Sequence, residues 1–118
     1  MNYLLVFLGG GVGSLCRFGI SQLLQRSAFN FPWATLLANA LSCIVFGVVA
    51  ELLLRGSINP QYRFLLLTGF CGGFSTFSTF TNETWLLLYN GQIFLALANI
   101  LLSLFVCLIC LYLGMKMV

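Results

Sequence analysis

A segment in the middle of the chain, GGFSTFSTF (residues 72–80), combines side chains that could bind a small anion. An aromatic ring carries partial positive charge at its edge. Phe77 and Phe80 stand at i and i+3, so they share one face of any helical stretch. Ser78 and Thr79 add hydroxyl donors beside them. Ring edges and hydroxyl groups could therefore attract an anion without a strong acid, whereas the alternative is that the phenylalanines only pack.

Two other apolar stretches carry polar side chains at helical spacing, which places them on one helix face. The polar residues are Thr35, Asn39, Ser42 and Cys43 in the first stretch, and Asn99, Ser103 and Cys107 in the second. An amide in an apolar environment must find a hydrogen-bond partner. Two interpretations stay open for each face: hydrogen bonds between helices, or the lining of a pathway in which Asn39 is a donor.

Two charged residues lie within or close to apolar stretches. Arg17 stands about two-thirds of the way through the stretch 2–24, where its charge must reach the interface, find a partner or face water. It either extends to the interface or provides a fixed positive charge at the mouth of an anion path. Glu83 lies about one turn past Phe80, and the simplest interpretation is an interfacial carboxylate.

Cysteines and glycines offer two motifs that we interpret as packing. Cys107 and Cys110 have C-x-x-C spacing, but a structural zinc site needs four ligands, and the chain has no His and no second such pair. The run GGGVG (residues 9–13) lacks the acidic residue and the lysine of nucleotide-binding loops. Close helix packing through glycine explains that run better.

Composition excludes most soluble and catalytic classes. Hydrophobic residues make up 61% of the 118 residues, charged residues 6%, and the mean hydropathy is +1.07. Lipid is therefore the expected solvent. With no His and only two acidic residues, catalytic triads and paired carboxylates lack their components, so we predict that the chain is not an enzyme. A net charge of +3 is too sparse for nucleic-acid binding.

The chain is long enough for four transmembrane helices, because a bilayer core takes about 20 helical residues. We predict an all-α integral membrane protein in which residues 1–118 form one four-helix domain. The expected helices cover about 2–24, 33–54, 62–89 and 92–117, joined by short turns.

The third helix is expected to be broken near the bilayer midplane, because its centre falls near Thr76. Glycine and hydroxyl residues weaken a helix there. Broken backbone at that depth is tolerated only inside protein or beside a wet cavity, where its polar groups can bind ions.

The charges of the loops specify orientation weakly. Arg55, Arg63 and Lys116 lie on the side of both termini, whereas Arg26 alone lies on the opposite side. A difference of two basic residues is a weak positive-inside signal. Insertion in both orientations would permit an antiparallel assembly.

Three motifs together resemble the Fluc fluoride channels, the small CrcB-like family: GGGVGSLCRF (9–18), ATLLAN (34–39) and GFCGGFSTFSTF (69–80). The resemblance covers essentially the whole chain. It implies a dual-topology homodimer of two antiparallel copies, with two pores that export fluoride passively and so reduce fluoride toxicity. It also implies a multi-pass protein of the bacterial plasma (inner) membrane.

The resemblance assigns roles to individual residues. Phe77 and Phe80 match the family's fluoride-contacting pair, and Asn39 matches its pore-lining asparagine. The family's polar-track hydroxyls match Thr35, Ser78 and Thr79, and Ser103 and Cys107 occupy track positions of the fourth helix. The family's arginine and glutamate match Arg17 and Glu83, as vestibule or structural charges.

The resemblance also implies a structural sodium ion at the centre of the dimer. Backbone carbonyl groups of Gly72 and Ser75, one pair from each subunit, match its ligands. Phe74 and Ser75 stand where the family often has Leu and Thr, which leaves backbone ligation intact. The alternative function is a four-helix small multidrug-type exporter, but that class uses a glutamate in its first span, and residues 2–24 contain no acidic residue.

Overall fold

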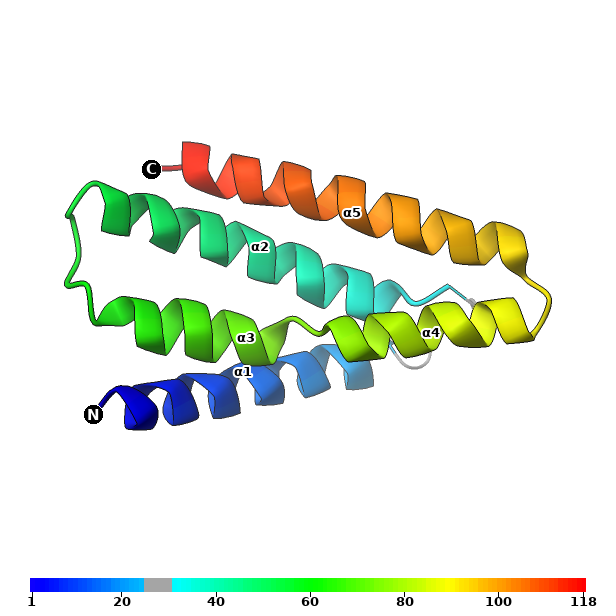
Figure 1. The fold of residues 1–118 in the computed structure, drawn as a ribbon, viewed down its shortest axis with the longest axis horizontal. Coiled ribbons are helices and arrows are strands. Elements are labelled where there is room, and N and C mark those ends of the chain that lie inside the picture. Colours follow the sequence, from blue (N-terminus) through cyan, green and yellow to red (C-terminus); the bar gives the residue numbers. More distant parts are fainter. Residues whose placement is uncertain (25–30) are drawn as a thin grey trace.

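The computed structural model describes residues 1–24 and 31–118 (Figure 1). Arg26, and with it most of the first expected turn, lies outside the described residues. The described helices are α1 (Asn2–Leu24), α2 (Trp33–Leu54), the π-helix η1 (Arg63–Cys71), α3 (Gly72–Phe74), α4 (Phe77–Tyr89) and α5 (Ile93–Lys116). Residues 1–24 and 31–118 contain no β-strand.

Four helical stretches of the described chain are long and apolar enough to cross a membrane. They are Asn2–Leu24, Trp33–Leu54, Arg63–Tyr89 and Ile93–Lys116, and the third comprises η1, α3 and α4. The prediction of an all-helical, multi-pass membrane protein is confirmed.

Helices that are not adjacent in sequence form the main contacts. α2 packs along α5, and α1 packs along η1 and α3. Each pair runs in the same direction, because both termini and the loop after α2 lie at one end of the molecule (Figure 1). At the other end, Asn90 and Gly91 turn the chain from α4 into α5, with Gly91 at a φ of 77°, a value that favours glycine.

Glycines let both helix pairs approach at the backbone. A Cβ atom on Gly9 would collide with the carbonyl oxygen of Leu65, and one on Gly13 with that of Phe70. In the other pair, Gly47 contacts the Leu111 carbonyl in the same way. The packing interpretation of the glycine run is thus confirmed at Gly9 and Gly13. Gly11 has no atom within 4 Å of such a Cβ, so it takes no part.

The first part of the third span differs from the plain α-helix that we expected. η1 has the wider turns of a π-helix, a conformation that is rare in proteins. Its backbone lies directly against α1, at Gly9 and Gly69. This close tertiary packing accompanies the irregular turns.

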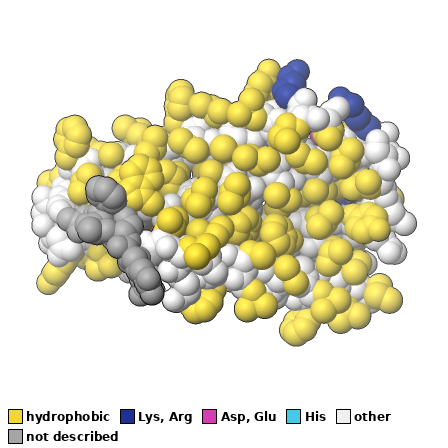
Figure 2. Space-filling model, turned by 180° about the vertical axis from the view of Figure 1, so that it is seen from behind, with side chains coloured by type: hydrophobic (Ala, Val, Ile, Leu, Met, Phe, Trp, Pro, Cys, Tyr) yellow, Lys and Arg dark blue, Asp and Glu magenta, His cyan; other side chains and the backbone are white. Residues whose placement is uncertain are grey.

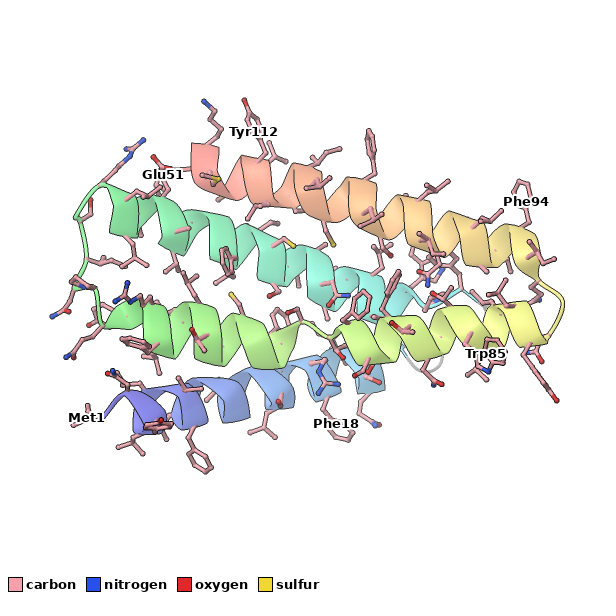
Figure 3. All side chains as sticks on the ribbon, in the orientation of Figure 1. Met1, Phe18, Glu51, Trp85, Phe94 and Tyr112 are labelled. Atoms are coloured by element: carbon pink, nitrogen blue, oxygen red, sulfur yellow. The ribbon has the colours of Figure 1, made fainter. Side chains whose placement is uncertain are left out.

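Apolar side chains cover the outside, as expected for a chain solvated by lipid. Figure 2 shows hydrophobic side chains over most of one face, with Lys and Arg at one end. The labelled rings of Phe18, Trp85, Phe94 and Tyr112 extend away from the helices (Figure 3). Polar side chains are instead buried between the helices: Thr35, Ser42, Thr84, Asn99 and Ser103. This inverted arrangement concentrates hydrogen-bonding groups inside the bundle.

Candidate functional site

The site is built around two residues of extended backbone between α3 and α4. Ser75 has φ and ψ of −86° and 155°, and Thr76 has −150° and 124°. Figure 1 shows the ribbon leaving the helical path at this point. The backbone N–H of Ser75 still donates to the carbonyl oxygen of Cys71 at 2.9 Å. The backbone N–H of Thr76 has left the helical path, so it needs another partner.

Asn39 of α2 provides those partners for Thr76. The backbone N–H of Thr76 donates to Oδ1 of Asn39 at 2.9 Å, and Nδ2 of Asn39 lies 3.5 Å from the carbonyl oxygen of Thr76. The side-chain amide thus pairs with the backbone of Thr76 much as a neighbouring peptide group would. Asn39 holds the interrupted segment against α2.

Hydroxyl groups form hydrogen bonds with backbone groups at the two helix ends that meet at the break. Oγ1 of Thr76 accepts the backbone N–H of Thr79 at 3.3 Å, which caps the N-terminus of α4. The hydroxyl groups of Ser78 and Thr79 lie 3.3 Å and 3.2 Å from the same oxygen. On the other side, Oγ of Ser75 donates to the carbonyl of Cys71 at 2.6 Å. Thr76 is therefore a structural residue of the site that our sequence analysis did not single out for this role.

An open groove with a volume of about 340 Å³ runs past the break. Its wall includes Asn39, Ser75, Thr76, Phe77, Phe80 and Ser103, together with Cys43, Cys107 and three leucines. The ring centroids of Phe77 and Phe80 are 5.9 Å apart, with the planes at 45°. The first turn of α4 begins at the break, and those of its N–H groups that Thr76 does not cap give partial positive charge there. The groove thus brings two phenyl rings together with hydroxyl and amide groups. Its surface is mostly apolar, because the amide of Asn39 and the hydroxyl groups of Ser75 and Ser103 bind neighbouring protein groups.

Part of the segment 72–80 is exposed to the outside of the single chain. Phe77 is 78% exposed. Gly72 and Ser78 are exposed as well. Of the residues predicted for the anion path, four line the groove: Asn39, Phe77, Phe80 and Ser103. Ser78 lies on an exposed surface of α4, and Thr35 and Thr79 line a second hollow.

A smaller hollow of about 80 Å³ lies on another side of the break. Arg17, Thr35, Thr76, Thr79 and Glu83 line it, with Ser21 and Ala34. Nε of Arg17 donates to the carbonyl oxygen of Gly73 at 3.2 Å, so the side chain contacts α3 within the bundle. Oε1 of Glu83 is buried without a hydrogen-bond partner among the described residues. A hollow of this size can hold water, which a buried carboxylate oxygen requires.

A second polar cluster joins α4 to α5. Nδ2 of Asn99 donates to Oγ1 of Thr84 at 2.9 Å, and Oγ of Ser103 donates to Oδ1 of Asn99 at 3.3 Å. Thr84 in turn donates to the carbonyl of Phe80 at 2.9 Å. Asn99 is only 1% exposed, so it acts as a connection between helices. Ser103 belongs to this cluster and also lines the groove.

Sequence reasoning missed Thr84 and the pairing of Cys71 with Ser42. Thr84 and Asn99 lie at nearly equal distances in sequence from the turn at Asn90 and Gly91, so a tight helical hairpin brings them together. That symmetry was available in the sequence. In contrast, the contact between Cys71 and Ser42 joins α2 to η1, and no spacing along the chain indicates it.

Comparison with known proteins gives one family over nearly the whole chain. Residues 4–115 match the family described as "CrcB-like protein, Camphor Resistance (CrcB)". A "Fluoride-specific ion channel FluC" of Pyrococcus horikoshii is 45% identical over 111 residues, covering 93% of this chain and 89% of the relative. Proteins of the same name from Thermus thermophilus and Shewanella baltica are each 42% identical. The alignments cover 98% and 99% of this chain, and 94% and 95% of those relatives.

Proposed function

Because this chain belongs to the CrcB-like family, we propose that it is a fluoride-selective ion channel and not an enzyme. It would let fluoride leave the cell passively and so reduce fluoride toxicity. The observation that carries the proposal is the groove at the break, where Phe77 and Phe80 meet Asn39 and the hydroxyl groups. Fluoride is small and strongly hydrated, so its path must replace water with contacts of this kind.

The proposed path uses residues of three helices. Phe77 and Phe80 present ring edges, while Asn39, Thr35, Ser78, Thr79 and Ser103 supply amide and hydroxyl groups along it. Arg17 provides a fixed positive charge near the hollow, and Glu83 a carboxylate beside it. The contact of Arg17 with the Gly73 carbonyl supports this role, because it holds the partly buried guanidinium group against α3.

The proposed assembly is an antiparallel, dual-topology homodimer with two pores, and the break lies near the bilayer midplane. The exposed groups at the break support a partner. Gly72 and Ser78 would otherwise expose backbone and hydroxyl groups to hydrocarbon, where such groups are costly. A second copy of the chain would cover them through a two-fold interface.

We further propose that a sodium ion pins the two copies at the centre of the dimer. Carbonyl groups of Gly72 and Ser75 from each copy would hold it, since oxygen ligands suit a hard cation. The weak charge asymmetry of the loops supports insertion in both orientations. The proposed location is the bacterial inner membrane.

Ion efflux from proteoliposomes tests the function. Purified protein is reconstituted, and the loss of fluoride or chloride is followed with ion-selective electrodes. Fluoride should leave rapidly and chloride at the rate of empty liposomes. Equal rates for the two ions, or no fluoride efflux, would refute the proposal. The multidrug-type exporter remains disfavoured, because α1 contains no acidic residue.

A further inference from the structure

The seam between α2 and α5 brings two cysteines together that the function proposed above does not require. Gly47 and Gly114 set the spacing of this seam. A Cβ atom on Gly47 would collide with the carbonyl of Leu111, and one on Gly114 with that of Ile44. The helices therefore approach at the backbone, and side chains one or two turns away meet directly.

Cys43 lies one turn before Gly47, and Cys107 lies two turns before Gly114. Cys107 also lies one turn before Leu111, the residue that Gly47 contacts. Because α2 and α5 run in the same direction, this register places Cys43 and Cys107 at the same level of the seam. Both residues line the groove, beside Asn39 and Ser103. Cys43 and Cys107 thus share one wall of the groove, whereas the C-x-x-C partner Cys110 is not in that wall.

The ligand set limits which ion could bind. The described residues contain no group of three or more His, Cys, Asp or Glu that could hold a metal, so a four-coordinate zinc site is not available at this seam. Two sulfur ligands suit soft ions that accept linear, two-coordinate geometry. The net charge of the bound complex limits the choice of metal ion further. Two thiolates neutralise a divalent ion, whereas a monovalent ion would leave a net negative charge in an apolar environment, which is costly.

We propose that Cys43 and Cys107 form a two-coordinate binding site for a thiophilic, divalent metal ion, with mercury(II) as the probe. Each thiol loses its proton as a metal–sulfur bond forms, so one ion displaces two protons and yields a neutral S–Hg–S bridge. The bridge would span the groove wall from α2 to α5. In a channel with the proposed path, which this consequence presumes, the bound ion would block fluoride.

Direct binding is measured first, because it does not depend on transport. Purified protein is loaded with one equivalent of mercury(II) and challenged with excess monothiol, and retained metal is counted by native mass spectrometry. A chelate of two thiolates should resist the monothiol, and losing either one should weaken retention about 100-fold or more. We expect Cys43→Ser and Cys107→Ser to lose the metal. Cys16→Ser and Cys110→Ser serve as matched controls and should keep it.

If Cys43→Ser retains mercury, or if Cys110→Ser loses it, the proposal is overturned. The metal would then be bound within α5, by Cys107 and Cys110. Loss of mercury from the unmutated protein would overturn it as well. Size-exclusion profiles check that each variant remains folded, and the two single variants test the pair independently. Fluoride efflux then gives a separate measurement: mercury should block the unmutated protein and spare Cys43→Ser. If binding follows this pattern but the protein carries no fluoride at all, the metal site stands and the proposed function fails.

Discussion

Two asparagines within apolar helices of this protein make opposite use of the same side chain. Asn39 pairs with backbone, through both its amide atoms, at the extended residue Thr76. Asn99 pairs only with side chains, Thr84 and Ser103, and is almost completely buried. Asn39 also lines the groove, whereas Asn99 does not.

The difference separates two tasks that polar residues perform in a membrane. Asn39 replaces hydrogen bonds that the interrupted helix lost, so it maintains an irregular backbone that can serve a pathway. Asn99 ties α4 to α5 and maintains the helical hairpin. Phe80 connects the two regions, because its carbonyl accepts from Thr84 while its ring lines the groove. Substitutions near the groove should therefore slow transport, whereas those in the hairpin should affect stability alone.

The largest effect on transport is expected from Phe80→Ile. The change removes the ring edge but keeps the backbone carbonyl that Thr84 uses. Losing an aromatic contact worth about 1.4 kcal/mol slows a rate about tenfold, and a dry site loses more. Fluoride efflux should fall at least that far while the oligomeric state on size exclusion stays the same.

Phe105→Ile is the matched control for this change, since Phe105 lies on the outside of α5 and is 68% exposed. It should leave efflux unchanged. Normal conduction by Phe80→Ile would remove the support for the ring-edge argument, and an equal loss in both variants would point to a general packing defect.

Asn39→Leu should have the next largest effect, on transport and stability together. It leaves the N–H and carbonyl of Thr76 without their partner, and an unsatisfied buried group costs about 1–3 kcal/mol. We expect slower fluoride efflux, a lower free energy of unfolding in mixed micelles, and faster hydrogen exchange at the Thr76 amide. Unchanged exchange at that amide would contradict the positioning role.

Asn99→Leu makes the same substitution in the other region and should affect stability alone. Side-chain hydrogen bonds in membrane proteins contribute about 0.6 kcal/mol on average and up to about 1.7. The unfolding free energy should fall within this range, with fluoride efflux nearly unchanged. A double-mutant cycle with Thr84→Val should show coupling of similar size. A loss of efflux as great as that of Asn39→Leu would remove the distinction between the two asparagines.

The sequence predicted the membrane class and the four spans because both depend on hydrophobicity, which adds up along the chain. The polar face of α2 could also be recognised from spacing. The partner of Asn39 could not, because two interpretations of an amide in an apolar helix have the same periodicity. Only the tertiary contact with Thr76 distinguishes them. The register that places Cys43 and Cys107 at one level of the seam could not be predicted for the same reason, since it depends on glycine contacts between distant helices.

Ser103→Ala should have the smallest effect and tests where the two regions meet. Its hydroxyl donates to Asn99 over 3.3 Å, and the residue also lines the groove. Because other hydroxyl groups line the proposed path, we expect a modest slowing of efflux and a loss of stability of about 0.6 kcal/mol.

Combining Ser103→Ala with Asn99→Leu separates the two contributions. In the double variant the stability losses should not add, because the two residues share one hydrogen bond. The slowing of efflux should persist, because it comes from the hydroxyl in the groove. If the slowing disappears in the Asn99→Leu background, Ser103 acts only through Asn99. Ser103 would then belong to the cluster around Asn99 and not to the proposed path.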